Sequence, residues 1–250
     1  MNESANAVSV RGLKMSFGDH QIYDGLDLEV RRGETLTVAG ASGTGKSVLL
    51  KLIIGLYKPD AGAIFVDGED VVPLDEQALR SMRRKVGMLF QGSALFDSMN
   101  VGDNVAYGLY EHYEWPPEKI AARVAECLEW VGLPGAQAMA PADLSGGMKK
   151  RVGLARALAP GPSTILYDEP TTGLDPFNTR RINELIVGLN DRLHVTSIVI
   201  THDLEAAFAV SDRIALLDER RIVLVSDIES ARRAPPPRLA AFMRGEESPK

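Results

Sequence analysis

Residues 40–47 read Gly40-Ala41-Ser42-Gly43-Thr44-Gly45-Lys46-Ser47 and fill every fixed position of the phosphate-binding pattern Gly-x-x-x-x-Gly-Lys-Ser. The apolar run 36–39 precedes this loop, and the apolar stretch 48–54 follows it as an expected helix that ends near Gly55. Glycines let backbone N–H groups turn inward around phosphate oxygens, and the helix adds its positive N-terminal end. We expect Lys46 to reach the β- and γ-phosphates of a nucleotide and the Ser47 hydroxyl to bind Mg²⁺. The alternative, a glycine-rich turn that carries Lys-Ser by chance, is disfavoured by the preceding strand.

Residues 8–40 have the pattern of strands. Leu26, Leu28 and Val30 alternate with charged residues, as on a half-buried antiparallel strand. Turn signals punctuate the stretch at Gly18-Asp19 and at 32–34. The N-terminal part is therefore expected to form a separate antiparallel layer.

The remainder of the chain alternates between helical and strand patterns. Helical spacing dominates from about 100 to 160, most clearly over 117–131, where Cys127 lies on the apolar face and is expected to be a buried structural thiol. Short apolar strands return at 164–167 and 197–200, separated by a helix that Asp175-Pro176 caps. This order predicts an α/β fold with a mainly parallel sheet and an inserted α-helical subdomain. We expect one domain, with a core over about 8–90 and 161–230, the helical subdomain over about 91–160 and a loosely held tail over 231–250.

Asp168 and Glu169 follow the apolar strand 164–167 directly. A P-loop requires a further carboxylate for its metal, and Asp168 is placed to hold Mg²⁺ through water. Glu169 lies one residue further on, so its side chain points differently and is expected to polarise an attacking water as general base. An ordinary strand-ending Asp-Glu-Pro turn is the alternative, which the presence of the P-loop disfavours.

Residues Ser145-Gly146-Gly147 open a second helix whose first turn is suited to an anion. One chain thus carries two candidate phosphate-binding helix starts. The basic residues Lys149, Lys150 and Arg151 follow, and we expect them to form a solvated stripe rather than a nucleic-acid site.

The composition limits the function classes. A net charge of −6 and a pI near 5.3 give no basic footprint for nucleic acid. The start of the chain lacks the pattern of a signal peptide, and no stretch approaches the roughly 20 apolar residues of a membrane span. We therefore expect a cytoplasmic protein that reaches a membrane only through a partner or a surface contact.

The chain resembles the ATP-binding-cassette (ABC) ATPases over about residues 8–230, because Leu144 to Met148 matches their signature motif. The resemblance implies a Q-loop glutamine at Gln91, a D-loop over 172–175 that ends at Asp175, and a switch histidine at His202 that contacts the γ-phosphate. Phe17 resembles the aromatic residue that stacks on adenine, with a place in the core as the alternative. His202 has the alternative of a capping residue. The implied nucleotide-binding set also includes Val48, and the implied metal set is Ser47, Gln91 and Asp168.

The same resemblance implies a mechanism. Two copies pair head to tail, and each ATP lies between the P-loop of one copy and Ser145-Gly146-Gly147 of the other. ATP closes this dimer and hydrolysis reopens it, a population shift driven by contacts made only in the closed state.

Residues 88–101, together with 144–151 and the chain length, are similar to the ATPases of Mla/MCE-type phospholipid transport systems. Such an ATPase would serve an integral membrane permease and an MCE-type lipid-binding protein from the cytoplasmic face of a bacterial inner membrane. The apolar residues Ala94-Leu95-Phe96 suit a socket for a short permease helix, with plain core as the alternative. Rival functions are an amino-acid or other small-solute importer ATPase and a soluble iron–sulfur-assembly ATPase. A DNA-repair ATPase is disfavoured, because no long coiled-coil insertion separates Lys46 from Asp168.

Overall fold

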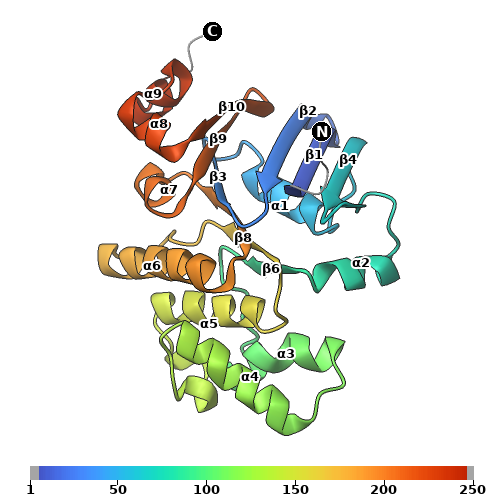
Figure 1. Cartoon of the computed structure of the whole chain (residues 1–250), viewed down its shortest axis with the longest axis vertical. Helices are drawn as coiled ribbons and strands as arrows, with labels where there is room; N and C mark the ends of the chain where they lie inside the picture. Colours follow the sequence, from blue (N-terminus) through green and yellow to red (C-terminus); the bar gives the residue numbers. More distant parts are fainter. Residues whose placement is uncertain (1–5, 247–250) are drawn as a thin grey trace. The chain divides into compact units, whose positions relative to one another are not determined.

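The computed structural model describes residues 6–246, which fall into two compact units. Unit 1 contains the chain up to Met82 and again from Thr196, and unit 2 contains Arg83–Val195. Figure 1 labels their helices and strands. Residues 1–5 and 247–250 lie outside the described residues. They include the start of the chain, where no signal-peptide pattern was found, and the end of the predicted tail.

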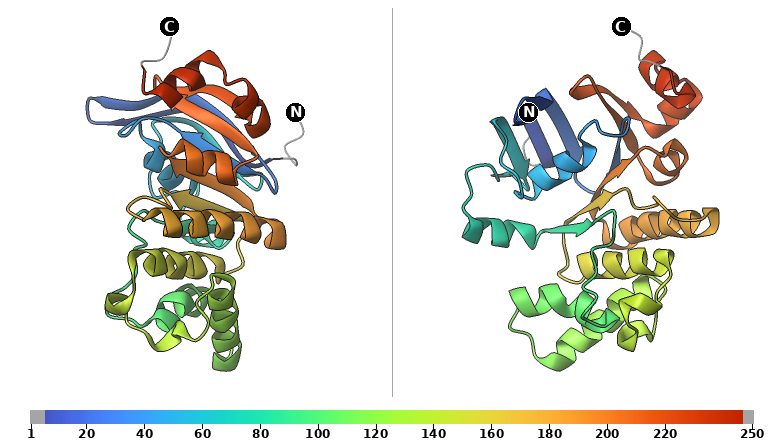
Figure 2. Two further views of the ribbon diagram at one scale, coloured as in Figure 1. Left: turned by 90° about the vertical axis from the view of Figure 1, so that its left-hand side faces the viewer. Right: turned by 180° about the vertical axis from the view of Figure 1, so that it is seen from behind.

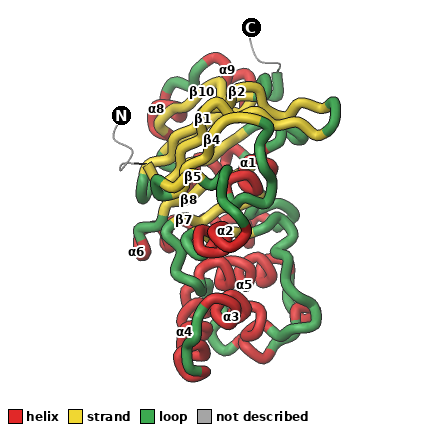
Figure 3. The backbone as a smooth tube through the Cα atoms, turned by 90° about the vertical axis from the view of Figure 1, so that its right-hand side faces the viewer, coloured by secondary structure: helices red, strands yellow, loops and turns green. Residues whose placement is uncertain are grey.

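An antiparallel sheet forms one layer of unit 1. Its strands run in the order β2-β1-β4-β5 and span β1 (Asn6–Phe17), β2 (His20–Arg31), β4 (Ala61–Val66) and β5 (Glu69–Asp70). In β2, Leu26, Leu28 and Val30 are buried while the charged residues between them are exposed. Figure 3 shows these strands side by side. The predicted antiparallel layer and its inward face are confirmed.

A second set of strands in unit 1 carries the loop of residues 40–47. It contains β3 (Thr35–Ala39), β8 (Thr196–Thr201), β9 (Arg213–Asp218) and β10 (Arg221–Asp227). Strand β3 pairs in parallel with both β8 and β9, and every residue of β3 and β8 is buried. Helix α1 (Lys46–Ile53) contacts β4 and β8, and α7 (Leu204–Val210) contacts β3 and β8 (Figure 1). Helices thus cover the strands on which the loop depends, as a buried parallel sheet requires.

The C-terminal segment of unit 1 differs from its prediction as a loosely held tail. It forms α8 (Ile228–Arg233) and α9 (Pro237–Arg244). Leu239 is fully buried in a cluster with Ala39, Ala207 and Ile214, so this segment completes the core beside β3 and α7. Four apolar positions (Ile228, Ala231, Leu239 and Phe242) supply the contact, and the polar composition of the segment concealed them.

Unit 2 combines a parallel strand pair with helices. Strands β6 (Val86–Leu89) and β7 (Thr164–Asp168) pair in parallel. The helices are α3 (Val101–His112), α4 (Pro117–Trp130), α5 (Gly146–Leu158) and α6 (Pro176–Leu193), and α2 (Glu76–Arg83) ends at the border of the unit. Helix α5 contacts α3, α4, α6 and β6, and Figure 2 shows α3, α4 and α5 gathered in one green-to-yellow group. The predicted helix over 117–131 is confirmed, with Cys127 buried on its inner face.

No helix within residues 6–246 is both long enough and apolar enough to span a membrane.

Candidate nucleotide site

The loop of residues 40–47 has a backbone that requires its glycines. Gly43 and Gly45 have φ values of 81° and 98°, in the left-handed region that disfavours side chains. A Cβ atom on Gly40 would lie 2.6 Å from the carbonyl oxygen of Leu217. Gly45 is the N-cap of α1, so the loop delivers the chain directly into the positive end of a helix.

Lys46 is buried within this loop. Its side-chain nitrogen donates hydrogen bonds to the carbonyl oxygens of Gly40 at 2.8 Å and Ala41 at 2.9 Å. The hydroxyl of Thr44 also donates to the carbonyl of Ala41, which fixes the turn. A buried cation, two left-handed glycines and a helix N-terminus together fit a polyphosphate chain.

Tyr23, which the sequence did not single out, supports the loop from β2. Its hydroxyl donates a 2.6 Å hydrogen bond to the carbonyl oxygen of Gly45. A Cβ atom on Gly45 would lie 2.5 Å from the Cγ2 atom of Ile22, so the loop rests directly on this strand. Burial raises the pKa of Tyr23 well above its ordinary value, and the hydroxyl remains a donor. Nothing in the strand pattern of β2 distinguishes Tyr23 from its neighbours. Its contact with Gly45 becomes evident only when β2 and the loop before α1 are seen packed together.

Two further predicted residues of unit 1, Phe17 and His202, are exposed. Phe17 ends β1 with 44% of its surface exposed, and its ring meets Tyr57 edge-on at 5.4 Å between centroids. The alternative that Phe17 is core is therefore wrong. His202 follows β8, but the N-cap of α7 is Asp203, whose side chain accepts from the backbone N–H of Ala206. The alternative that His202 caps this helix is also wrong.

In unit 2, Asp168 and Glu169 are both buried at the end of β7. Glu169 has a φ of 48°, a left-handed conformation that is uncommon for a residue with a side chain. Its Oε2 atom accepts a 3.0 Å hydrogen bond from the hydroxyl of Thr172. The strand therefore ends at Asp168, and the backbone of Glu169 turns away from the strand direction.

The basic residues after Ser145-Gly146-Gly147 are not a solvated stripe, so that prediction was wrong for Lys150 and Arg151. Lys150 is buried and donates to the carbonyl oxygens of Gln91 at 2.5 Å and of Glu169 at 3.1 Å. Desolvation lowers the pKa of Lys150, while the charges of Asp168 and Glu169 act in the opposite direction. Arg151 is buried against the carbonyls of Val131 and Gly132, just beyond the C-terminal end of α4. Helix α5 is buried on more sides than its apolar stripe indicated, and carbonyl groups of other segments accept hydrogen bonds from its buried cations.

The start of α5 contacts the start of α6. Ser145 is the N-cap of α5 and accepts from the N–H of Met148. A Cβ atom on Gly147 would lie 2.5 Å from the Oδ1 atom of Asn178. Asn178 donates to Asp175 from its backbone at 3.0 Å and from its side chain at 2.6 Å, and these bonds lower the pKa of Asp175. The predicted signature and D-loop segments are thus packed together, and Asp175 caps α6 as predicted.

The segment after Gln91 is largely exposed, although Ser93 within it is buried. Gln91, Ala94 and Phe96 are exposed and Leu95 is half-buried, so the alternative of plain core is wrong for Ala94 and Phe96. Arg156 on α5 donates to the carbonyls of Ser93 at 2.8 Å and Ala94 at 2.6 Å. The ring of Phe96 lies 4.8 Å from that of Tyr107 on α3, and both rings are about 40% exposed.

The buried residue Asn104, also missed by the sequence, organises the same segment. Its Oδ1 atom accepts from the N–H of Phe96, and its amide nitrogen donates to the carbonyls of Phe96 and Met99. An asparagine inside a helical pattern gives no signal of this kind, because its partners lie in the preceding loop.

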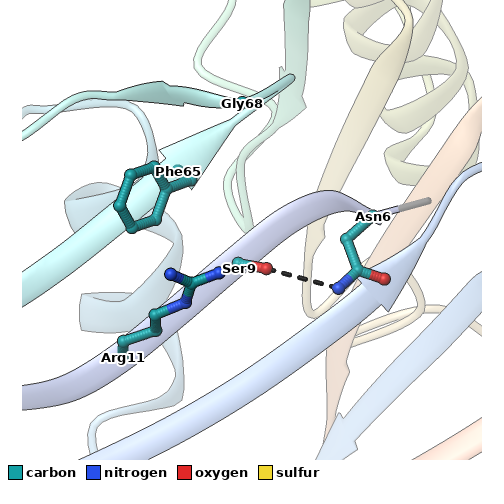
Figure 4. Close-up of a pocket in the computed structure, with 5 residues that line it drawn as sticks. All are labelled: Asn6, Ser9, Arg11, Phe65 and Gly68. Atoms are coloured by element: carbon teal, nitrogen blue, oxygen red, sulfur yellow. Dashed lines mark hydrogen bonds between the residues drawn. The ribbon is translucent and has the colours of Figure 1, made fainter. Parts of the chain in front are cut away.

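Two hollows of unit 1 do not match a phosphate ligand. Figure 4 shows the first, a hollow of about 10 Å³ on the antiparallel sheet where the guanidinium of Arg11 lies over Phe65. It has room for about one water molecule. The second measures about 340 Å³ beside Ala41, but Asp218, Glu219 and Glu246 give it the wrong charge for phosphate. The loop itself, rather than either hollow, is the phosphate site that the geometry favours.

Comparison with known proteins assigns these features to one family. The family model described as "ABC transporter" matches residues 23–172. The chain is 40% identical to the intermembrane phospholipid transport system ATP-binding protein MlaF of Haemophilus influenzae, over 96% of this chain and 91% of that protein. It is also 40% identical to the probable ribonucleotide transport ATP-binding protein mkl of Mycobacterium leprae, over 96% of this chain and 69% of that protein.

Among solved structures, the ATP-binding cassette MJ0796, in a dimeric post-hydrolysis state bound to ADP and Pi, superposes with a TM-score of 0.81. The two sequences are 31% identical, and the match covers 88% of this chain and 98% of that one. With a matching family model, close relatives over nearly the whole length and the same fold, the chain belongs to the ABC transporter family and is an ATPase of that family.

Proposed function

We propose that this ATPase powers an MCE/Mla-type transporter that moves phospholipids between the inner and outer membranes of a bacterium. The observation that carries the proposal is the 40% identity to MlaF, which extends over 96% of this chain and 91% of that protein. The equally identical mkl protein is matched over only 69% of its length, so MlaF is the better match in overall length.

We assign the following roles in hydrolysis. Residues 40–48 bind the phosphates through backbone N–H groups and the ammonium of Lys46, and Phe17 stacks on the adenine. Glu169 holds the attacking water as general base, Gln91 orients it, and His202 contacts the γ-phosphate. The strained backbone of Glu169 and the bond from Thr172 support its role, because preorganised carboxylates are typical of catalytic positions.

The residues present fit ATP with Mg²⁺. The hydroxyl of Ser47, the amide oxygen of Gln91 and the carboxylate of Asp168 are oxygen donors of the type that Mg²⁺ prefers. When bound, the ion would neutralise charge on the phosphate oxygens. The left-handed glycines and the buried Lys46 supply the matching cradle for those oxygens.

The active form in this proposal is a head-to-tail dimer of two copies. Ser145, Gly146 and Gly147 of one copy complete the site around the ATP held by the P-loop of the other. Exposure of Ser145 and Gly146 supports this arrangement, as does the dimeric state of the related cassette MJ0796. Asn178 lies against Gly147 and donates to Asp175, so Asp175 belongs to the same surface and would lie near the nucleotide shared with the partner copy.

A membrane permease is the second proposed partner, and it holds the chain at the cytoplasmic face of the inner membrane together with an MCE-type lipid-binding protein. The exposed pair Phe96 and Tyr107 offers an apolar seat for a short permease helix. Its position just after Gln91 would connect that helix to the γ-phosphate.

Copurification and transport test this proposal. The chain, solubilised from membranes in detergent, should copurify with a permease and an MCE-type protein. In proteoliposomes, the complex should transfer labelled phospholipid to acceptor vesicles only with ATP, and Glu169→Gln should abolish the transfer. If the complex instead transports ribonucleotides or amino acids and does not transfer phospholipid, the proposed substrate class is wrong. Recovery of the chain only in soluble complexes after membranes are pelleted would sink the transporter proposal altogether.

The docking surface has its own test. Replacing Phe96 and Tyr107 by serine should abolish copurification with the permease while ATP affinity stays within about twofold of the parent. Val187→Ser on α6, which changes an apolar residue with a similar exposure of 37%, is the matched control and should copurify normally.

A further inference from the structure

Lys150 is a buried cation of unit 2 that the proposed mechanism leaves unused. It belongs to α5, the helix that lies between α6 on one side and α3 and α4 on the other (Figure 1). Only 5% of its surface is exposed. A buried ammonium group is costly unless hydrogen-bond acceptors surround it, so its partners define what it does.

Those partners come from two functional segments that are far apart in the sequence. The ammonium group of Lys150 donates to the backbone carbonyl of Gln91 at 2.5 Å and to that of Glu169 at 3.1 Å. Lys150 itself lies five residues after Ser145, on the helix that Ser145 caps. The ammonium group of Lys150, on the signature helix, thus forms hydrogen bonds to both the Q-loop residue and the residue assigned as general base.

The conformation of Glu169 makes this contact consequential. Its φ of 48° is unfavourable for a residue with a side chain, so neighbouring groups must hold it. Thr172 holds the carboxylate end at Oε2, and Lys150 at 3.1 Å and the backbone N–H of Thr172 at 3.3 Å hold the backbone end at the carbonyl oxygen. Without the bond to Lys150, the carbonyl keeps only the longer bond from the Thr172 N–H among these two, and we expect the peptide to relax toward a commoner conformation and to carry the carboxylate with it.

We infer that Lys150 is a positioning residue for hydrolysis, which ties the backbones of Gln91 and Glu169 to the signature helix so that the three move together. This inference rests on the proposed role of Glu169 as general base. A displacement of about 1 Å at a reacting group can reduce turnover by about a hundredfold, whereas ATP binding depends on the separate P-loop.

The test is a comparison of kcat and ATP affinity among variants of the full chain in its membrane complex. Lys150→Met keeps the length of the side chain and removes its donors. It should lower kcat by roughly ten- to a hundredfold, while KM and the Kd for ATP change by less than about threefold. Lys150→Arg retains donors and should recover most of the lost kcat.

Two controls separate positioning from general support of the fold. Lys149→Met removes the neighbouring, partly exposed lysine and should leave kcat unchanged. Arg156→Met removes bonds from the same helix to the same loop, at Ser93 and Ala94, but leaves Glu169 tied. It should therefore cost at least about tenfold less in kcat than Lys150→Met.

The inference is overturned if Lys150→Met retains kcat within about threefold of the parent, or if Arg156→Met loses as much. If Lys150→Met does not fold, Lys150→Gln, whose side chain is uncharged and one atom shorter, decides instead: reduced kcat with normal ATP affinity supports the inference, and normal kcat ends it. Glu169→Gln, measured in parallel, separates the two proposals, because unimpaired turnover in that variant removes the assigned base whatever Lys150 does.

Discussion

The hydroxyl of Tyr23 donates a 2.6 Å hydrogen bond to the carbonyl oxygen of Gly45, the residue that caps the helix carrying Lys46. The same carbonyl also accepts from the backbone N–H groups of Val48 and Leu49. A strand of the antiparallel layer, β2, thereby helps to hold the phosphate-binding loop in position. We therefore expect the affinity for nucleotide to depend on this support as well as on the loop itself.

Tyr23→Phe should therefore weaken ATP binding several-fold and destabilise the protein by about 0.5–1.5 kcal/mol. The cost is modest because the Gly45 carbonyl keeps its two backbone donors. Fluorescent-nucleotide titration and urea unfolding measure the two effects. Full ATP affinity in the phenylalanine variant would show that β2 does not support the loop.

Lys46→Ala should abolish tight nucleotide binding, because the cation that neutralises the phosphates is lost. The loop should also loosen, since the carbonyls of Gly40 and Ala41 lose their donor. Equilibrium binding of ATP in the presence of Mg²⁺ gives the result directly. Unchanged affinity would refute the role assigned to Lys46.

Glu169→Gln should trap an ATP-bound dimer that turns over at least about a hundredfold more slowly. The amide keeps the size of the side chain and an oxygen that can accept from Thr172, but it cannot act as a base. Size-exclusion chromatography with ATP and single-turnover hydrolysis measure dimer and rate. A normal rate would remove Glu169 as the base.

Gly147→Ala should destabilise the protein by about 1–3 kcal/mol, because the new methyl group would lie 2.5 Å from Oδ1 of Asn178. Gly146→Ala is the matched control for stability, since its nearest neighbour, Leu174, would lie at 3.7 Å. Urea unfolding of both variants, and of Gly147→Ala combined with Asn178→Ala, tests the contact. The double variant should recover part of the loss, and purely additive effects would contradict a direct clash.

The stability of the protein should fall with pH in the alkaline range because of Cys127. Burial raises the pKa of this thiol from its ordinary value of 9.0 to about 11. The folded state therefore holds the thiol proton more tightly than the unfolded state. The contribution of this proton to the free energy of unfolding is complete below pH 9 and is lost as pH rises toward 11. The loss should reach about 2 kcal/mol near pH 10.5. Urea unfolding of the parent and Cys127→Ala between about pH 8 and about pH 10.5 should show a steeper fall in the parent, and equal slopes would contradict it.

Most of the fold could be predicted because its signals are local. The alternation of Leu26, Leu28 and Val30 predicts a strand with one buried face, and the structure confirms it. The cap at Asp175 and the helix after it were likewise readable from neighbouring residues. The C-terminal segment was not, because Leu239 is buried, and Phe242 partly buried, by contact with residues near Ala39 and Ala207, far away in the sequence.

The candidate site divides in the same way. The positions of the phosphate-binding loop, of Asp168-Glu169 and of Ser145-Gly146-Gly147 follow from contiguous motifs. The burial of Lys150 and Arg151 does not, because a helical wheel cannot anticipate carbonyl acceptors from other segments. The exposure of Phe17 and Phe96 was also open until their neighbours were known.

The sequence by itself determined that this chain binds nucleotide phosphates, because a phosphate cradle is made by consecutive backbone groups whose conformations depend on glycines at fixed spacings. Tertiary structure alone decided which residues hold that cradle and the proposed base in place. Tyr23 reaches Gly45, and Lys150 reaches Gln91 and Glu169, through contacts that arise only when separate segments pack together. A charge or hydroxyl acquires such a role from its distance to an acceptor, and that distance is set by the packing of helices and strands rather than by order along the chain.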